Sequence, residues 1–186
     1  MGTIMESKEE NVLSLFFNEP TKEWHFEEIV RKAGITGGKA DRWLKNFIIE
    51  GLIRRIKEKG KMPYYVSKYD TPSYRNRKKL FAFKMLYAVG FLNHLVSLPK
   101  AKTVILFGSF TRSDWYWKSD IDLFVYGEPD GLKLADYEIK LGRDVQVFNC
   151  RNQKELEKFG EGFIKNVIKG NIIKGELDFI RVGLNA

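Results

Sequence analysis

The chain has 186 residues, of which 44% are apolar and 30% are charged, a composition typical of a globular protein with one or two domains. No window approaches the roughly 18 consecutive apolar residues of a membrane helix, and the polar N-terminus does not resemble an export signal. Cys150 is the only cysteine, which excludes an internal disulfide. Together these features predict a cytoplasmic protein with no membrane partner.

The net charge of +8 is concentrated in the first 80 residues, which hold 17 basic against 11 acidic side chains. An excess of positive charge in one part of a chain favours a polyanionic partner, of which nucleic acid is the commonest. The alternative is that these lysines and arginines only solvate the surface.

The first fifty residues predict three helices. Apolar residues at helical spacing place them over Glu6–Phe17, Trp24–Ala33 and Lys39–Glu50. Pro20 follows the first helix, Thr21 is the candidate cap of the second, and Gly34 ends the second. The short joint between the second and third helices is typical of a helix-turn-helix.

A β-hairpin is predicted next, with strands over Leu52–Ile56 and Tyr64–Val66. Three helices followed by a hairpin resemble prokaryotic winged-helix DNA-binding domains. That resemblance implies a third helix in the major groove and a hairpin against phosphates. The DNA-binding residues that it implies are Lys39, Arg42, Lys45, Arg54, Arg55 and Lys57. Winged helices also dock proteins, which is the alternative to DNA contact.

A linker is predicted over Tyr69–Asn76, followed by one long helix over Arg77–Leu98 that joins two domains. The predicted boundaries are a winged-helix domain over residues 1–68, a linker and spacer helix over 69–100, and a second domain over 101–186. His25 and His94 stand alone, without the spacing of metal ligands, and are interpreted as structural or surface residues.

The stretch Thr103–Tyr126 carries the clearest chemistry. Two apolar runs predict buried strands, and they flank a Gly108–Ser109 turn and the pair Asp120 and Asp122. Residues two apart in a strand share a face, so the two carboxylates point the same way. Paired carboxylates suit Mg²⁺, and backbone N–H groups at a Gly-Ser turn suit a phosphate.

Between these motifs lies Asp114–Lys118, which contains two tryptophans and a tyrosine. These rings suit base stacking or a partner surface, and covering the sheet is the alternative. Further along, helices are predicted over Leu132–Leu141, Asn152–Phe159 and Glu161–Lys169, and a third strand over Asp144–Phe148. Residues 170–180 fit either a turn or a strand.

Gly108–Ser109, ten residues and then Asp120-x-Asp122 resemble the signature of the minimal nucleotidyltransferases of the DNA polymerase β-like superfamily. The resemblance covers residues 103–180. It implies that Asp120 and Asp122 hold Mg²⁺, that Gly108 and Ser109 bind the triphosphate, and that Arg112 offsets charge on the leaving pyrophosphate. It also implies that the substrate is a nucleoside triphosphate, with ATP as the first candidate.

The resemblance further implies a third acid on the third strand. Counting from Gly142–Arg143 places that position at Gln146, whereas Asp144 lies two residues earlier on the same face, roughly 7 Å along the strand. Asp144 is therefore the candidate third residue, both as a metal ligand and as the group that orients the acceptor hydroxyl. Without a third carboxylate the site has two strong ligands and a neutral oxygen.

The sequence predicts a mixed α+β protein, with an N-terminal winged helix-turn-helix followed by a nucleotidyltransferase fold with a small mixed sheet. The leading interpretation is a Mg²⁺-dependent transfer of a nucleoside monophosphate to a hydroxyl of a protein or small molecule, coupled to a DNA-binding module. The resemblance adds an antitoxin role, with a separately encoded toxin as acceptor. The alternative is a winged-helix transcriptional regulator whose nucleotidyltransferase fold is inactive and serves to sense a ligand or to dimerise. A homodimer is a candidate assembly.

Overall fold

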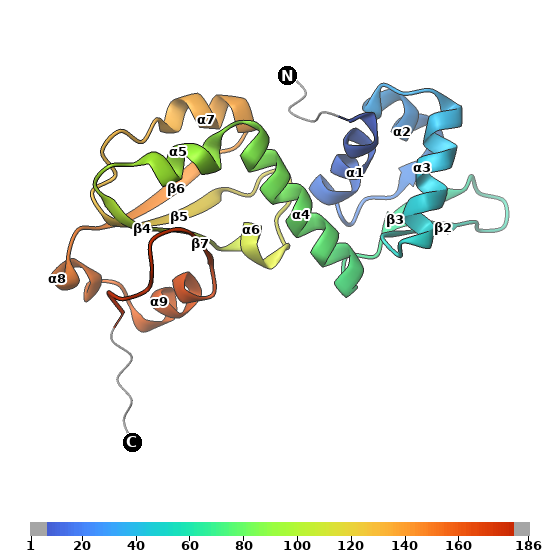
Figure 1. The fold of residues 1–186 in the computed structure, drawn as a ribbon. Coiled ribbons are helices and arrows are strands. Elements are labelled where there is room, and N and C mark those ends of the chain that lie inside the picture. Colours follow the sequence, from blue (N-terminus) through green and yellow to red (C-terminus); the bar gives the residue numbers. More distant parts are fainter. Residues whose placement is uncertain (1–6, 181–186) are drawn as a thin grey trace. The chain divides into compact units, whose positions relative to one another are not determined.

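A computed structural model describes residues 7–180. The described chain forms two compact units (Figure 1). The first contains the chain up to Ala88 together with the separate segment Ser113–Lys118. The second contains Val89–Arg112 and the chain from Ser119 onward. The chain therefore enters the first unit a second time, between the two predicted site motifs.

The first unit consists of helices around a small antiparallel sheet of strand order β1-β3-β2. Its elements in chain order are α1 (Lys8–Asn18), β1 (Trp24–His25), α2 (Phe26–Ala33), α3 (Gly37–Ile49), β2 (Ile53–Ile56), β3 (Tyr64–Ser67) and α4 (Pro72–Ala88). Three helices and a hairpin follow one another in the predicted order, with differences at the helix ends, and the predicted start at Glu6 lies outside the described residues. The winged-helix assignment itself stays a prediction.

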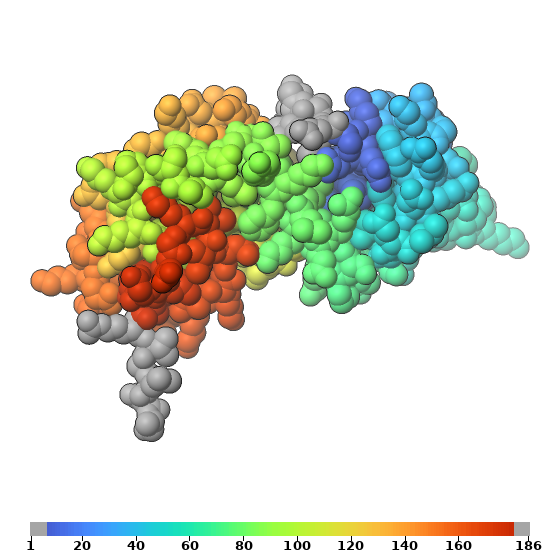
Figure 2. All heavy atoms as spheres, in the orientation of Figure 1, coloured from blue at the N-terminus to red at the C-terminus, as the bar shows by residue number. Residues whose placement is uncertain are grey.

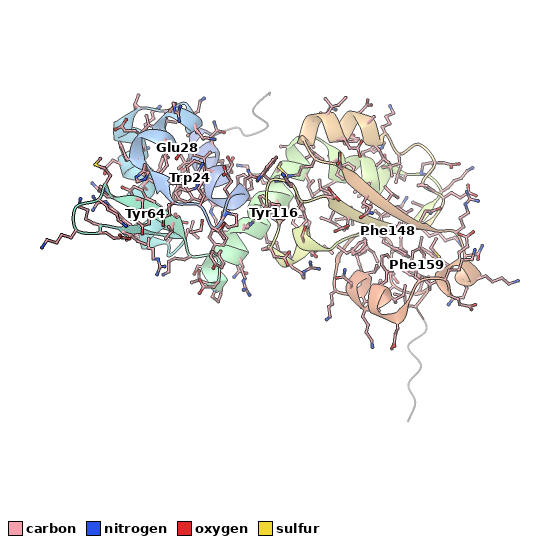
Figure 3. All side chains as sticks on the ribbon, turned by 180° about the vertical axis from the view of Figure 1, so that it is seen from behind. Trp24, Glu28, Tyr64, Tyr116, Phe148 and Phe159 are labelled. Atoms are coloured by element: carbon pink, nitrogen blue, oxygen red, sulfur yellow. The ribbon has the colours of Figure 1, made fainter. Side chains whose placement is uncertain are left out.

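The start of the second helix was predicted two residues too early. Trp24 and His25 form strand β1, paired with Tyr65 and Tyr64 of β3, and α2 begins only at Phe26. His25, not Thr21, occupies the cap position. Trp24 is fully buried, and its pairing across 41 positions is a non-local effect that helical spacing does not reveal. Figure 3 labels Trp24 and Tyr64 on this sheet.

The predicted linker and single long helix are both wrong. Helix α4 already begins at Pro72, a position where proline is tolerated because the first helical N–H groups need no partner within the helix. The Thr71 hydroxyl accepts the Tyr74 N–H at 3.4 Å. The long helix is interrupted after Ala88, and α5 (Phe91–Ser97) follows Gly90, which adopts a left-handed backbone with φ +78°.

The second unit is built on a small mixed sheet, as predicted, and its strand order is β6-β5-β4-β7. Besides α5 it contains β4 (Ala101–Phe107), α6 (Ser109–Arg112), β5 (Ile121–Gly127), α7 (Leu134–Leu141), β6 (Val145–Cys150), α8 (Gln153–Leu156), α9 (Glu161–Ile168) and β7 (Asn171–Lys174). Strand β4 runs antiparallel to both neighbours, whereas β5 and β6 are parallel.

One face of this sheet carries an aromatic core. Phe163 of α9 packs on Phe148 at 5.0 Å and on Phe159 at 4.7 Å between ring centroids, and Phe107 joins at 5.5 Å. Figure 3 shows Phe148 and Phe159 in this cluster. Within the segment that the sequence left open, residues 171–174 form strand β7 and the following residues form turns. The red atoms of Figure 2 include this segment.

Among residues 7–180, no single helix is long and apolar enough to cross a membrane. The consecutive helices α4 and α5 together pass that test by length and composition only, as a bent pair.

Candidate functional site in the second unit

The turn after β4 brings the first site motif against the second. Phe107, the last residue of β4, pairs with Asp122 of β5, and Gly108 then turns the chain with φ +72°. A β-carbon built on Gly108 would lie 1.9 Å from Oδ2 of Asp122 and 2.8 Å from its Cγ. The Asp122 carboxylate therefore occupies the space that any other residue at 108 would need.

Asp122 is held in an electrostatically unfavourable position. Burial raises the pKa of its carboxyl, and the nearby Asp120 carboxylate raises that pKa further. Two weaker effects oppose the shift in pKa: the positive charge of Arg112, and the backbone N–H of Ser109, which donates to the carboxylate. The site thus concentrates negative charge that the described residues only partly neutralise.

This donor set fits a divalent cation. Asp120 is exposed and Asp122 is half-buried, and the two are separated by Ile121, whose side chain is fully buried in the opposite direction. Because the Asp120 carboxylate raises the pKa of Asp122, a bound hard cation would offset this repulsion, and hard cations prefer oxygen ligands of this kind. The predicted pair is therefore brought together on one face, at the start of β5.

The register of β5 and β6 shows which residue of β6 lies beside Asp122. Asp122 lies directly opposite Gln146, and Ile121 lies opposite Val145. Asp144 precedes β6, is exposed, and accepts the Ile121 N–H through its carbonyl at 2.9 Å. No group of three or more His, Cys, Asp or Glu side chains within the described part of the chain is arranged to hold a metal. Asp144 as third ligand stays a prediction.

Arg112 is exposed at the end of α6, and its Nη1 donates to Oδ1 of Asn166 on α9 at 3.2 Å. Its charge lowers the pKa of Asp122, so the guanidinium lies within electrostatic reach of the carboxylates. Asn166 was not among the predicted site residues, because its contact with Arg112 spans 54 positions and no local pattern marks it.

Comparison with known families agrees with this geometry. Residues 92–177 match the family model described as polymerase beta, nucleotidyltransferase. The matched region contains the Gly108–Ser109 turn, both carboxylates of β5 and strand β6, and it supports the nucleotidyltransferase superfamily for this part of the chain. The first unit up to Ala88 lies outside the match. Neither the curated proteins nor the solved structures gave a match.

The aromatic side chains between the two motifs lie in different environments, and base stacking or a partner surface stays a prediction for the exposed rings. Trp115 is fully buried and packs in the core of the first unit, where its ring stacks on Phe81 of α4. Tyr116 and Trp117 are 48% and 57% exposed. Lys118 lies over the Trp117 ring at 4.8 Å.

Predicted DNA-binding residues in the first unit

The basic residues of α3 and the hairpin are all exposed, but their charges are not equally available. Lys39 and Arg42 have no ion pair within residues 7–180, whereas Lys45 forms a 2.7 Å pair with Asp41. Lys57 donates to the Lys61 carbonyl at 2.5 Å. This surface therefore presents fewer unpaired cations than the sequence suggests.

The hairpin separates two of the predicted residues. Arg55 pairs with Tyr65 and Arg54 with Val66, so the two arginines point to opposite faces of the sheet. Arg55 borders a mostly apolar pocket of about 580 Å³ with Lys45, Ile48 and Met62. Met62 is 73% exposed, so the surface beside α3 is partly apolar as well as basic.

Proposed function

We propose that the protein is a Mg²⁺-dependent nucleotidyltransferase that transfers a nucleoside monophosphate from a triphosphate to a hydroxyl of a protein or small molecule. ATP is the first candidate for the triphosphate. The observation that carries this proposal is the close approach of the Asp122 carboxylate to Gly108, because a triphosphate bound at the Gly108–Ser109 turn would lie beside this carboxylate. The match of residues 92–177 to the nucleotidyltransferase family supports it.

The chain's own residues have distinct tasks in this reaction. Gly108 and the Ser109 hydroxyl hold the terminal phosphates, and Arg112 offsets the charge that develops on pyrophosphate. The acceptor oxygen attacks the α-phosphorus in line, the bond from that phosphorus to the bridging oxygen of the β-phosphate breaks, and pyrophosphate leaves. Asp144 accepts or orients the hydroxyl proton. Positioning and charge stabilisation supply the rate enhancement.

Asp120 and Asp122 are the residues that would hold the magnesium ion. When bound, the ion supplies charge neutralisation at the triphosphate. The carboxylates in turn need that neutralisation, because Asp120 raises the pKa of Asp122.

The test is isothermal titration with a nonhydrolysable ATP analogue, with and without Mg²⁺, followed by a search for pyrophosphate release with candidate acceptors. We expect Mg²⁺-dependent binding that is lost in Asp122→Asn. The matched control is Asp136→Asn, an exposed aspartate on α7. Binding that persists in Asp122→Asn, or that is absent from the wild type, would contradict the proposal.

We propose further that the first unit is a winged-helix DNA-binding module. The order of three helices and a hairpin supports this, as do the exposed side chains of Lys39 and Arg42. A DNA-binding module joined to a nucleotidyltransferase suits an antitoxin-like protein that modifies a separately encoded toxin and regulates its own synthesis.

One observation favours a second candidate function. The residue opposite Asp122 is the neutral Gln146, so the neighbouring position on β6 carries no charge. A regulator whose nucleotidyltransferase fold binds a nucleotide without transferring it would tolerate this glutamine. Mg²⁺-dependent binding without pyrophosphate release from any acceptor would favour the regulator.

A further inference from the structure

Arg143 contacts two pieces of the candidate site and adjoins a third, and all of them belong to the second unit. It follows α7 and directly precedes Asp144, the candidate third acid. Its side chain reaches two segments that lie far from it in sequence. One is helix α6, after the turn at Gly108, and the other is the residue before Asp120. One side chain thus contacts a neighbour of each predicted motif.

The first contact holds the backbone on both sides of Asp120. Nη1 of Arg143 donates to the Ser119 carbonyl at 2.9 Å, and Ser119 directly precedes Asp120. The following peptide group is bonded to the same loop, because the Ile121 N–H donates to the Asp144 carbonyl at 2.9 Å. Hydrogen bonds from a charged donor are stronger than those between neutral groups. The two peptide groups that flank Asp120 are therefore both bonded to residues 143 and 144.

The second contact reaches the helix that carries Ser109. The Arg143 guanidinium lies over the Phe110 ring, with Cζ 5.3 Å from the ring centroid. Phe110 is fully buried on α6 and directly follows Ser109. A cation over an aromatic face is attracted to it, and arginine stacks in this way because its charged group is planar. The ring and the guanidinium therefore link α6 to the loop before β6.

Arg143 is itself held by the end of α7. Gly142 ends that helix with φ +63°, and its N–H and that of Arg143 donate to the Glu138 carbonyl, at 2.8 and 3.3 Å. The Glu138 side chain accepts the Val145 N–H at 2.9 Å. The backbone on both sides of Arg143 is thus bonded to one residue of a helix, which leaves the base of the arginine side chain few alternative positions.

We infer that Arg143 is a positioning residue for the nucleotide site, which sets Asp120 against the Gly108–Ser109 turn. It acts through the Ser119 carbonyl and the Phe110 ring. The inference rests on the proposed nucleotidyltransferase function and deepens it, because it makes metal-dependent nucleotide binding depend on a side chain outside the set of proposed ligands. Loss of the guanidinium should loosen Asp120 and α6 while the centre of the sheet keeps its structure.

The experiment compares Arg143→Met with Arg151→Met, which removes the same charged side chain from an exposed position after β6. Hydrogen exchange of the unliganded proteins is measured first. In Arg143→Met we expect faster exchange in Ser109–Arg112 and Ile121–Leu123, whereas Val104–Leu106 in the centre of β4 exchanges as in the wild type. In Arg151→Met the exchange of all three segments stays as in the wild type.

A purely structural role would speed exchange throughout the sheet, including Val104–Leu106, and that result overturns the inference. Unchanged exchange in all three segments of Arg143→Met overturns it as well. Because this measurement needs no nucleotide, it decides the inference even if the wild type binds no triphosphate and the proposed function fails. If Arg143→Met does not fold, Arg143→Gln, which keeps a polar side chain, replaces it with the same outcomes.

Titration with the nonhydrolysable ATP analogue at several Mg²⁺ concentrations gives the second result. Loss of a group that orients metal ligands typically lowers metal affinity by roughly 10- to 100-fold. We therefore expect the Mg²⁺ concentration for half-maximal binding to rise by at least about tenfold in Arg143→Met and to stay unchanged in Arg151→Met.

A folded Arg143 variant with the Mg²⁺ requirement of the wild type contradicts the inference, because a residue that only stabilises the fold would leave that requirement unchanged. Absence of Mg²⁺-dependent binding in the wild type contradicts the proposed function, and hydrogen exchange then decides the inference alone.

Discussion

A β-carbon at position 108 would lie 1.9 Å from Oδ2 of Asp122. The Asp122 carboxylate of β5 therefore occupies the space that a side chain at position 108 would need. Gly108 also has φ +72°, a left-handed backbone that glycine adopts at no steric cost. Two independent constraints therefore require glycine here. The contact brings the Gly-Ser turn and the Asp122 carboxylate together although they are separated in sequence.

Gly108→Ala is expected to abolish Mg²⁺-dependent nucleotide binding. The new methyl group must displace the Asp122 carboxylate, and a displacement of about 1 Å at a reacting centre costs on the order of 100-fold in rate. Gly131→Ala is the control, because Gly131 has φ +86° but no atom within 4 Å of a built β-carbon. Equal losses in the two variants would show that backbone strain, not the carboxylate contact, is responsible.

Asp122→Asn is expected to stabilise the metal-free protein at neutral pH while removing nucleotide binding. Burial and Asp120 raise the folded-state pKa of Asp122 above its unfolded value of about 3.9. Between the unfolded-state pKa and the raised folded-state pKa, the folded state therefore binds more protons than the unfolded state. Consequently the free energy of unfolding of the wild type falls as pH rises from the ordinary pKa through the raised pKa.

Chemical denaturation at several pH values in the presence of a chelator measures this effect. The stability difference between Asp122→Asn and the wild type should be small below about pH 3.9 and should grow toward pH 7. Asp136→Asn serves as the exposed control and should show no such growth. A difference that is constant with pH would contradict the raised pKa.

The local patterns predicted the strands beside the candidate site better than the connections around them. The turn at Gly108 and its flanking strands follow from residues that are close in sequence, and the pairing of Asp122 with Gln146 follows from the register of β5 and β6. The roles of these residues stay predictions. The break before Gly90 and strand β1 were missed, because helical spacing continues through them while non-local pairing decides their structure. The burial of Trp115 among α1 and α4 is likewise a contact between distant segments.

Gln146→Glu is expected to strengthen Mg²⁺ binding, by about tenfold or more, and to raise any transfer activity. The substitution adds a charge at the position directly opposite Asp122 with almost no change in shape, and affinity for hard cations rises with the number of charged ligands. Titration of Mg²⁺ and pyrophosphate release are measured together. Gln153→Glu, an exposed position on α8, is the matched control.

Asp144→Asn completes that comparison. If Asp144 already acts as the third carboxylate, its loss should reduce binding and Gln146→Glu should restore it. If Asp144→Asn has no effect on the wild type, the third-acid role does not belong to Asp144, and the two-carboxylate site of Asp120 and Asp122 is complete as it stands.

Tyr74→Phe is expected to destabilise the first unit by about 0.5–1.5 kcal/mol. The Tyr74 hydroxyl is buried and donates to the Phe16 carbonyl at 2.8 Å, and its burial raises the pKa of this phenol, so it stays a hydrogen-bond donor across the working range. The free energy of unfolding measures the change. Tyr69→Phe, at a residue that is 53% exposed, should leave stability unchanged.

Arg54→Ala and Arg55→Ala are expected to have unequal effects on DNA binding. The two side chains point to opposite faces of the hairpin, so a duplex that contacts one face reaches only one of them. A lost phosphate contact reduces the slope of log affinity against log salt by about 1. Fluorescence anisotropy with duplex DNA at several salt concentrations measures that slope.

Lys39→Ala should reduce the same slope, because Lys39 is exposed on α3 with no ion pair among the described residues, whereas Lys154→Ala on α8 should not. Equal losses from both arginine variants would contradict a one-sided contact with the hairpin. A wild type whose affinity for DNA is insensitive to salt would exclude phosphate contacts as the source of binding, and would leave the partly apolar surface around Ile48 and Met62 as a protein-docking surface.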